Sequence, residues 1–360
     1  MKVGIIGASF AKAAFLPALR HVPGAEVVAL ASARMASAQA AASAFDVPHA
    51  YDDWEAMLGA HDLDLVCIAT PTFLHAPQTL AAIEAGAHVL CDKPTAMDAG
   101  EAAAMLAAAE ASGRIHMLDH ELRFNPNRMR VADLISDGSL GEIRHVDISN
   151  VGKTWGDPAS RPKGDWWSLA EKGGGRLGAN GSHQVDLLRW WLGEVSWITG
   201  AAPVMVPDRR DRESGEPWTA TADDVAYFTA EMASGAIAQV FMSGVAAHNM
   251  GNATRIFGSE GTVTLNNNDE RLFFARAGGE FEEITVADPN ADLPGVNAGI
   301  WNVSVVALMR ELCGAIQEER ALQHGATFAD GLANQMVLDA VKMSGSERRW
   351  IRPEETQAGV

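Results

Sequence analysis

A glycine turn near the N-terminus is the first candidate for chemistry. The apolar strand Lys2–Ile6 runs into Gly7, where a dinucleotide-binding protein has its G-x-G-x-x-G turn, but Ser9 and Lys12 replace the second and third glycines. Free N–H groups at the start of the following helix would hold a pyrophosphate, and Ser9 is small enough to let it approach. Lys12 is then a cation beside the phosphates, or an ordinary solvated lysine. Alone, the pattern fits a cofactor turn and a generic strand-to-helix turn equally well.

The end of the second apolar strand lacks the acid that binds the ribose of NAD. The chain there reads Ala29-Leu30-Ala31-Ser32-Ala33-Arg34, where a carboxylate would otherwise accept a hydrogen bond from the ribose 2′-hydroxyl. Ser32 and Arg34 can instead hold a 2′-phosphate, so the sequence favours NADP over NAD. The alternative is that Arg34 is a surface residue at the start of a helix.

Two further stretches place ionisable side chains at the ends of elements. Asp92-Lys93-Pro94 follows the apolar run Val89–Cys91, and His183 follows Gly181-Ser182 at the start of a helix. Desolvation lowers the pKa of a lysine, so a partly buried lysine near a cofactor can exchange protons. A helix N-terminus disfavours imidazolium, and a neutral histidine there can accept a proton from an alcohol. Both stretches are therefore candidates for proton transfer.

The order and spacing of these stretches resemble the Gfo/Idh/MocA family, the glucose–fructose oxidoreductase and inositol dehydrogenase group. The resemblance extends over nearly the whole chain. It rests on AGAHVLCDKPTAMD, GGGRLGANGSHQVDLLRWWLGE, ATPTFLHAPQTLAAIEAG, FGSEGTV and FADGLANQMVLDAVKMSGSERRW. It implies a Rossmann domain followed by an open-sheet α/β domain, frequent oligomers, and NAD(P)-dependent chemistry on sugars, cyclitols and related hydroxy compounds.

The resemblance implies roles for individual residues. Lys93 corresponds to the lysine of the family's Glu-Lys-Pro, near the substrate hydroxyl and the nicotinamide, and is the first catalytic candidate. Thr70-Pro71 corresponds to a loop that approaches the nicotinamide ribose, and His75 follows it as a cofactor-binding, structural or capping histidine. The candidate cofactor-binding residues are Gly7, Ser9, Phe10, Lys12, Ser32, Arg34, Thr70, Pro71, His75, Asp92 and Lys93.

The family's Asp-x-x-x-His motif is only half present. It maps to Ala179 and His183, so the histidine implied as a general base lacks its aspartate partner. Asp186, one turn further along the helix, would orient the ring or serve as an internal structural carboxylate. With alanine at 179, the geometry of catalysis differs, the substrate supplies other groups, or redox activity is lost.

Aromatic and cationic side chains accompany these motifs. Tryptophan rings flanked by charges suit the apolar and polar faces of a sugar-like ligand, and a packing role for Trp166 and Trp167 fits equally well. The cations Arg123, Lys153, Arg161, Lys163 and Arg176 are compatible with an acidic sugar, a phosphorylated sugar or a carboxylated diol. The candidate substrate-binding residues are Arg123, Lys153, Trp155, Trp166, Asn180 and His183.

The first 120 residues alternate apolar strands with helical segments. The strands are Val3–Ile6, Val27–Ala31, Leu65–Ala69, Val89–Cys91 and Ile115–Leu118, and the helices are Lys12–His21, Ser37–Phe45, Pro77–Ala85 and Asp98–Ala111. Nearly continuous apolar runs are typical of parallel strands buried on both faces. The rhythm predicts an α/β fold, with a doubly wound Rossmann sheet in a dinucleotide-binding domain of residues 1–121.

The pattern changes beyond Asp119. A helix over Pro126–Ser136 precedes an alternating strand, a further helix covers Ser182–Leu192, and hairpin turns follow at 233–235 and 259–261. Residues 122–360 are therefore expected to form an α+β domain with an open, mainly antiparallel sheet and helices on one face. We expect this domain to bind substrate and to form a homo-oligomer, a dimer or tetramer, through its sheet.

Composition excludes several classes of function. A formal charge of −18 argues against non-specific binding to nucleic acid or anionic membranes. Three widely spaced cysteines predict neither a metal site nor a disulfide framework. The chain has no leader-like N-terminus and no apolar run near the ~20 residues of a membrane span. We therefore expect a cytoplasmic protein without a metal.

The sequence predicts an enzyme, an NAD(P)-dependent dehydrogenase or reductase acting on the CH–OH group of a sugar or cyclitol. One alternative is a dehydrogenase of a carboxylated cyclic diol, which Ala179 and the cations suit. The other is a non-catalytic, cofactor-binding sensor or regulator of the same fold. Ala179 favours the sensor, whereas Lys93 and His183 argue against it.

Overall fold

The computed structural model describes residues 1–266 and 269–357. Contacts group them into two compact units. The first contains Met1–Asn125 and Asp288–Leu332, and the second contains Pro126–Ala287 and the described residues from Ala333 onward. The division of the chain between residues 121 and 122 stays a prediction, and the contacts additionally assign Asp288–Leu332 to the first unit. No helix within the described ranges is both long and apolar enough to cross a membrane.

The first unit is built on a parallel sheet of six strands in the order β3-β2-β1-β4-β5-β6. This confirms the predicted doubly wound sheet, in which the strand order reverses between β1 and β4. The short β3 was not predicted. The strands are β1 (Lys2–Ile6), β2 (Glu26–Ala31), β3 (His49–Tyr51), β4 (Leu65–Ile68), β5 (His88–Cys91) and β6 (His116–Leu118).

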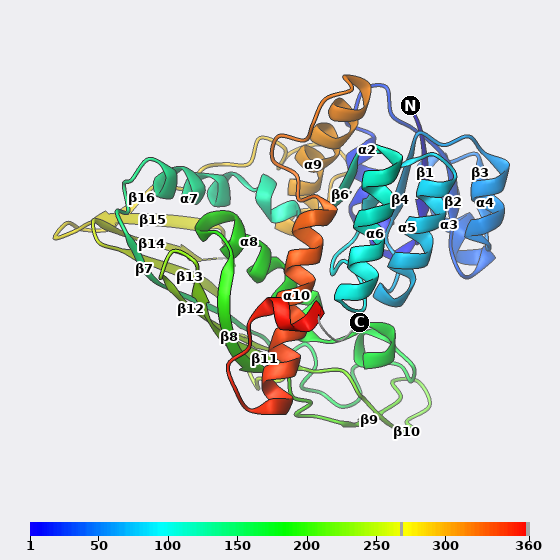
Figure 1. Cartoon of the computed structure of the whole chain (residues 1–360). Helices are drawn as coiled ribbons and strands as arrows, with labels where there is room; N and C mark the ends of the chain where they lie inside the picture. The colour runs from blue at the N-terminus through cyan, green and yellow to red at the C-terminus, as the bar shows by residue number, and fades with distance from the viewer. Residues whose placement is uncertain (267–268, 358–360) are drawn as a thin grey trace. The chain divides into compact units, whose positions relative to one another are not determined.

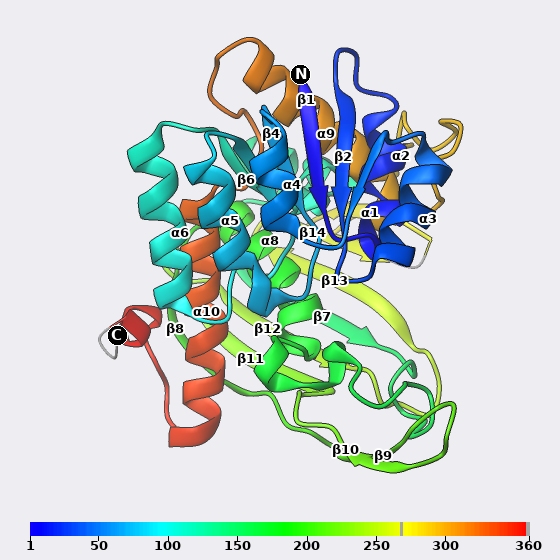
Figure 2. The same ribbon diagram turned by 90° about the vertical axis from the view of Figure 1, so that its right-hand side faces the viewer.

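Helices cover both faces of this sheet, because successive side chains of each strand enter two different cores. One core joins strand residues such as Ile5 to α2, α3 and α9, and the other joins Ile6 to α4, α5 and α6. Figure 2 shows α5 and α6 together on one side of the strands. The helices are α1 (Ser9–Ala13), α2 (Phe15–Leu19), α3 (Met35–Phe45), α4 (Trp54–Ala60), α5 (His75–Glu84), α6 (Ala99–Ser112) and α9 (Ile300–Gln317), with 3₁₀ turns η1 (Thr72–Leu74) and η2 (Glu121–Phe124).

The helix predicted over Lys12–His21 is two short helices, α1 and α2, which meet at Ala14. Pro17 explains the break, because it has no N–H to donate to the carbonyl of Ala13 and fits only within the first turn of a new helix. Helix α6 begins as predicted: Asp98 is its N-cap and accepts a hydrogen bond of 2.9 Å from the N–H of Glu101.

The second unit is built on a mixed sheet of eight strands in the order β16-β15-β14-β13-β7-β12-β11-β8. Only the pairing of β12 with β7 is parallel in this sheet as described, which confirms the open, mainly antiparallel sheet. The strands are β7 (Ile143–Val151), β8 (Val195–Ala201), β11 (Val225–Met232), β12 (Ile237–Ser243), β13 (Gly251–Gly258), β14 (Gly261–Asn266), β15 (Arg271–Arg276) and β16 (Glu282–Glu283); β9 (Asp208–Arg210) and β10 (Pro217–Thr219) form a separate pair.

Helices lie over one face of this sheet (Figure 1). They include α7 (Pro126–Ser136) and α8 (Ser182–Leu192), and a π-helix, η5 (Leu177–Gly181), precedes α8. The same unit contains the 3₁₀ turns η3 (Trp166–Ser168) and η4 (Ala170–Lys172). The π-helix packs on β11 and β12, with Gly181 against the side chain of Met242. Tyr227 and Phe241 lie opposite each other on the other face and are 42% and 47% exposed. Helix α10 (Phe328–Glu347) and η6 (Pro353–Gln357) end the described chain.

Candidate functional site

The turn after β1 is held in a conformation that only glycine adopts easily. Gly7 has a φ of 104°, and its N–H donates to the carbonyl oxygen of Ala31 at 2.8 Å. A Cβ atom at this position would lie 2.1 Å from the carbonyl oxygen of Ala69, at the end of β4. The turn is therefore pressed against the neighbouring strand, and Ser9 and Lys12 beyond it are exposed. Phe10 is half-buried and packs edge-on against Phe15.

The end of β2 presents the residues expected to select the cofactor. The N–H of Ser32 donates to the carbonyl oxygen of Tyr51 at 3.0 Å, which fixes the backbone, and the Ser32 side chain is half-buried. Arg34 stands at the N-cap position of α3 with an exposed side chain. Both the phosphate-binding and the surface interpretation of Arg34 fit this position.

Lys93 stands at the end of β5, beside a carboxylate. The Oδ1 atom of Asp92 accepts the N–H of Lys93 at 2.7 Å and lies 3.8 Å from its Nζ atom. The two side chains are only 12% and 14% exposed. The peptide bond from Lys93 to Pro94 is cis. The lysine is thus partly removed from water and lies beside the Asp92 carboxylate.

His75, in the first turn of α5, lies between two of the predicted loops. Its Nδ1 atom is 2.9 Å from the carbonyl oxygen of Pro94, and its Nε2 atom is 2.9 Å from the carbonyl oxygen of Thr70. The ring is 1% exposed. Burial lowers the pKa of His75, against the opposing effect of Asp92. Thr70 and Pro71 are themselves half-buried.

Two buried acids after β6 were missed by sequence reasoning. Asp119 is 1% exposed, its N–H donates to the carbonyl oxygen of Cys91 at 2.8 Å, and neither of its carboxyl oxygens has a hydrogen-bond partner among the residues described. Burial, and then the charge of Asp92, raise the pKa of Asp119 well above its usual range. Burial also raises the pKa of Glu121. The available signal was that parallel strands β5 and β6 both end in an aspartate, and such ends meet at one edge of the sheet.

In the second unit, the residues that match the incomplete motif lie in the π-helix and in α8. Ala179 and Asn180 belong to the π-helix, an irregularity often found at functional sites. The segment is anchored by Asp223, whose Oδ2 atom accepts the N–H of Leu177 at 2.7 Å. Burial raises the pKa of Asp223 to about 6. A Cβ atom at Gly175 would lie 2.2 Å from the same carboxyl group, so the glycine allows its close approach.

His183 lies in the first turn of α8 in a buried position, with 1% of its surface exposed. Asp186 is equally buried, and its Oδ1 atom accepts a hydrogen bond of 3.1 Å from Asn334 of α10. Asn334 in turn accepts one of 2.9 Å from Arg189. This contact gives Asp186 a structural role in joining α8 to α10.

Three arginines meet at Trp155, which is 5% exposed. The Arg161 guanidinium lies 5.1 Å from the ring centroid and is paired with Asp165 at 2.7 Å. Arg209 donates to the carbonyl oxygen of Trp155 at 2.7 Å and is paired with Asp224. The Arg176 guanidinium lies 5.9 Å from the ring and donates to the Oδ1 atom of Asn150. Within the described part of the chain it forms no ion pair, and burial lowers the pKa of Arg176.

The other predicted substrate residues are scattered. Arg123 is buried in the first unit and is paired with Asp330 at 3.1 Å. Lys153 is exposed, and its N–H donates to Asn249 at 3.0 Å. Trp166 is half-buried and stacked on Trp167, with 4.1 Å between ring centroids. The structure thus brings Gly7, Thr70, His75 and Lys93 to the ends of β1, β4 and β5 in the first unit, and Trp155, Asn180 and His183 to the second.

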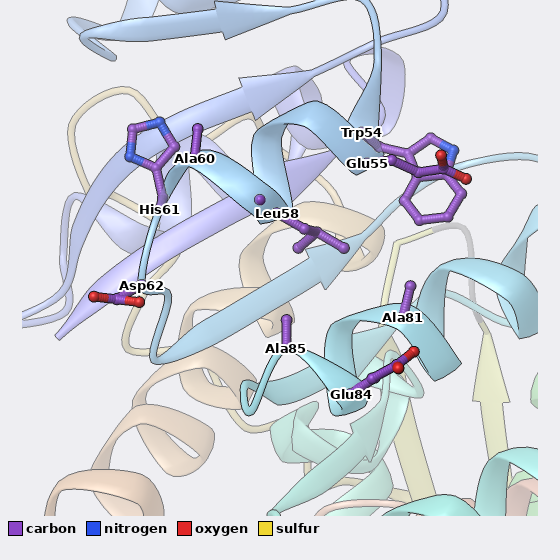
Figure 3. A pocket seen from close by; sticks show the side chains of 10 residues that line it. Trp54, Glu55, Leu58, Ala60, His61, Asp62, Ala81, Glu84 and Ala85 are labelled. Atoms are coloured by element: carbon purple, nitrogen blue, oxygen red, sulfur yellow. The ribbon is translucent and has the colours of Figure 1, made fainter.

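A pocket of about 490 Å³ lies elsewhere in the first unit, between α4 and α5. Figure 3 shows Trp54 and Leu58 of α4 on one side and Ala81 and Glu84 of α5 on the other. None of the residues that line it is a candidate from the sequence. The residues that line the pocket are Trp54, Glu55, Leu58, Gly59, Ala60, His61, Asp62, Ala81, Glu84 and Ala85.

The parallel six-stranded sheet, with its glycine turn after β1, is a Rossmann fold, and the matching family models make the chain an oxidoreductase with NAD(P) binding. Residues 1–120 match the model of an oxidoreductase family with an NAD-binding Rossmann fold, and residues 129–264 match the C-terminal domain of the same group. The chain belongs to the Gfo/Idh/MocA family.

Similar proteins extend over the whole chain. An inositol 2-dehydrogenase of Rhizobium meliloti is 28% identical, with 98% of each chain covered. A levoglucosan dehydrogenase of Pseudarthrobacter phenanthrenivorans is 26% identical, with 98% of this chain and 97% of the relative covered. A structure of levoglucosan dehydrogenase in complex with NADH and levoglucosan superimposes with a TM-score of 0.88 at 26% identity and covers 98% of each chain.

Proposed function

We propose that the protein transfers a hydride between a nicotinamide cofactor and a carbon that bears a secondary alcohol in a sugar, cyclitol or related hydroxy compound. The observation that carries this proposal is Lys93, partly buried beside Asp92 at the end of a Rossmann strand in a family of oxidoreductases. The inositol and levoglucosan dehydrogenases among the relatives support a polyhydroxylated substrate.

The residues of the first unit fit a dinucleotide. The turn at Gly7 follows β1, where the strand order reverses, and ligands of such sheets bind beyond the carboxyl ends of the strands at this point. Ser9 is exposed there for contact with phosphate, and Thr70-Pro71 follows the adjacent strand β4. When bound, the nicotinamide supplies the hydride acceptor or donor.

The chain's own residues then have to manage one proton. In the oxidative direction the neutral amine of Lys93 accepts the hydroxyl proton, and in the reductive direction its ammonium returns that proton to the oxygen. The Oδ1 atom of Asp92, 3.8 Å from the Nζ atom of Lys93, helps to hold the lysine side chain in place. We assign His183 a supporting role as a proton acceptor, with Asn180 as a substrate contact from the preceding π-helix.

A substrate screen tests this function directly. Sugars, uronates, cyclitols and diols are offered with NAD and with NADP, and the absorbance of the reduced nicotinamide is followed. Turnover of at least one polyhydroxylated compound is the expected result. Tight cofactor binding without turnover of any compound would instead favour the sensor, which Ala179 suits.

We further propose that NADP binds about tenfold or more tightly than NAD, a difference of ~1.4 kcal/mol in binding free energy. The reason is the exposed guanidinium of Arg34 at the end of β2, where no acid is present to bind the ribose 2′-hydroxyl. The substitution Arg34→Ala is expected to weaken binding of NADPH but not of NADH, and fluorescence titration with each cofactor measures the two Kd values. Arg114→Ala, at another exposed arginine of the same unit, is the control. Tighter binding of NADH by the unmodified protein would contradict the assignment.

A second candidate substrate, a carboxylated cyclic diol, is favoured by Arg176. Of the three arginines around Trp155, Arg161 and Arg209 are paired with carboxylates, whereas the Arg176 guanidinium donates to the neutral amide of Asn150 and forms no ion pair with any residue described, although the charge of Asp223 acts on it. A partly buried guanidinium without a paired carboxylate is suited to bind an anionic group of a ligand.

For that candidate, Arg176→Met is expected to raise the KM for a carboxylated substrate about tenfold or more, because a charge-assisted hydrogen bond contributes about 1.5–3 kcal/mol. The KM for a neutral sugar should change little. Steady-state kinetics on a matched sugar and uronate measure the difference, with the exposed Arg255→Met as control. Equal effects on both substrates would argue against a carboxylate contact.

We also propose that the exposed sheet face around Tyr227 and Phe241 joins copies of the chain in a dimer or tetramer. These two large aromatic side chains lie opposite each other on neighbouring strands and form an exposed apolar surface. Association of two copies of the chain through this face would bury that surface. Light scattering of the purified protein measures the assembly.

A further inference from the structure

His75 joins two loops that both belong to the candidate site of the first unit. One carbonyl that it contacts belongs to Pro94, next to Lys93, and the other belongs to Thr70, next to Pro71. The loops follow β4 and β5, which are parallel neighbours with Ile68 opposite Cys91. A single buried ring therefore bridges the segment proposed to contact the nicotinamide ribose and the segment proposed to transfer the proton.

The two contacts have a defined chemistry, because a carbonyl oxygen only accepts hydrogen bonds. A ring protonated on both nitrogens donates to both loops. The neutral ring has one N–H, so its two tautomers donate either to Pro94 through Nδ1 or to Thr70 through Nε2. The two loops thus depend on different atoms of the same side chain.

The other ends of both loops are already fixed. The N–H of Asp92 donates to the carbonyl oxygen of Ile68 at 2.9 Å, and the N–H of Ala69 donates to that of Ile6 at 2.7 Å. Thr70 is also held through its hydroxyl, which donates to Gln78 of α5 at 2.7 Å. Contacts to the ring therefore link Thr70 directly to Pro94.

We propose that His75 is a positioning residue that fixes the Lys93–Pro94 loop relative to the Thr70–Pro71 loop, and so sets where Lys93 stands relative to the nicotinamide. This rests on the proposed function, in which Lys93 transfers the proton. It replaces direct cofactor binding as the role of His75, since a ring that is 1% exposed and faces two main-chain carbonyls acts through the loops.

Two substitutions separate the two contacts. In His75→Asn the amide nitrogen takes the place of Nδ1 and retains the bond to Pro94, and in His75→Gln it takes the place of Nε2 and retains the bond to Thr70. We expect His75→Asn to weaken NADH binding about tenfold with kcat little changed. We expect His75→Gln to keep the Kd of NADH and to lower kcat about tenfold or more, because small displacements of a reacting group reduce rates steeply.

The control is His116→Asn, because His116 is a histidine of the same unit whose Nδ1 atom accepts the N–H of Phe328 at 3.0 Å, away from both loops. Its Kd and kcat should stay unchanged, whatever its melting temperature. If the two His75 variants alter Kd and kcat alike, in proportion to lost stability, His75 only packs and the proposal is wrong.

A third measurement uses the unmodified protein and therefore applies even if the His75 variants do not fold. Nitrogen-15 NMR of histidine-labelled protein is expected to show a slowly exchanging ring N–H for His75, and a rapidly exchanging ring would contradict the proposal. If no substrate is turned over, the proposed function fails. The Kd values of NADH for His75→Asn and His75→Gln still test the positioning role of His75, because equal values for the two variants would overturn that role.

Discussion

Replacing Lys93 with methionine is expected to lower kcat by about 10²–10⁴-fold, the usual contribution of a positioned acid or base. Methionine keeps an unbranched side chain of similar length but can neither accept nor donate the proton. Because we propose that the cofactor is held mainly at the turn that contains Gly7, we expect the Kd of NADH to change little. The loss should therefore appear in turnover.

The measurement needs a demonstrated substrate, steady-state kinetics over a range of pH, and a separate NADH titration. Lys342→Met is the matched control, because this lysine is 55% exposed and is paired with Asp339 of the same helix at 3.4 Å. It should keep the full kcat. Unchanged turnover in Lys93→Met would show that another group transfers the proton, and His183 would then be the next residue to replace.

Replacing Gly7 with alanine is expected to destabilise the first unit and to abolish NADH binding. A non-glycine residue at a φ of 104° costs about 1–3 kcal/mol in backbone strain. The new Cβ atom would in addition lie 2.1 Å from the carbonyl oxygen of Ala69, which is main chain and moves only with β4. Relief of that overlap displaces the turn from the strand ends where the dinucleotide is proposed to bind.

Urea unfolding and NADH titration measure the two effects. Gly59→Ala is the matched control, because Gly59 lies inside α4 and a Cβ atom there meets no other atom within 4 Å. Alanine forms helices more readily than glycine, so this control should be at least as stable as the unmodified chain. A Gly7→Ala protein as stable as the unmodified chain would mean that the turn can move without loss.

Local patterns predicted those parts of the fold that depend on local chemistry. The buried parallel strands have continuous apolar runs, α6 begins after Asp98, and the turn at Gly235 lies between β11 and β12. Helix α4 was missed although Asp53 is its N-cap, because only seven residues follow. The π-helix has no characteristic sequence period, so neither Ala179 nor its neighbours predicted that the segment would be a π-helix.

The candidate site was predictable as a set of motifs but not as a network. Spacing and resemblance pointed to Gly7, Lys93 and His183. The contact of His75 with Thr70 and Pro94, and the burial of Asp119 beside β5, depend on which strands become neighbours. Such pairings follow from tertiary packing, which a linear pattern does not contain.

Helix α9 has a consequence for the order in which the chain is completed during synthesis. Its residues Val305, Leu308 and Leu312 are fully buried in the same core as Ile5 and Phe15. The core of the first unit therefore stays incomplete until more than 300 residues have been made. Because domains normally fold as they leave the ribosome, a ribosome-bound chain that ends near residue 125 carries an exposed apolar surface. Helix α9, which is made late, therefore completes the domain that is made first.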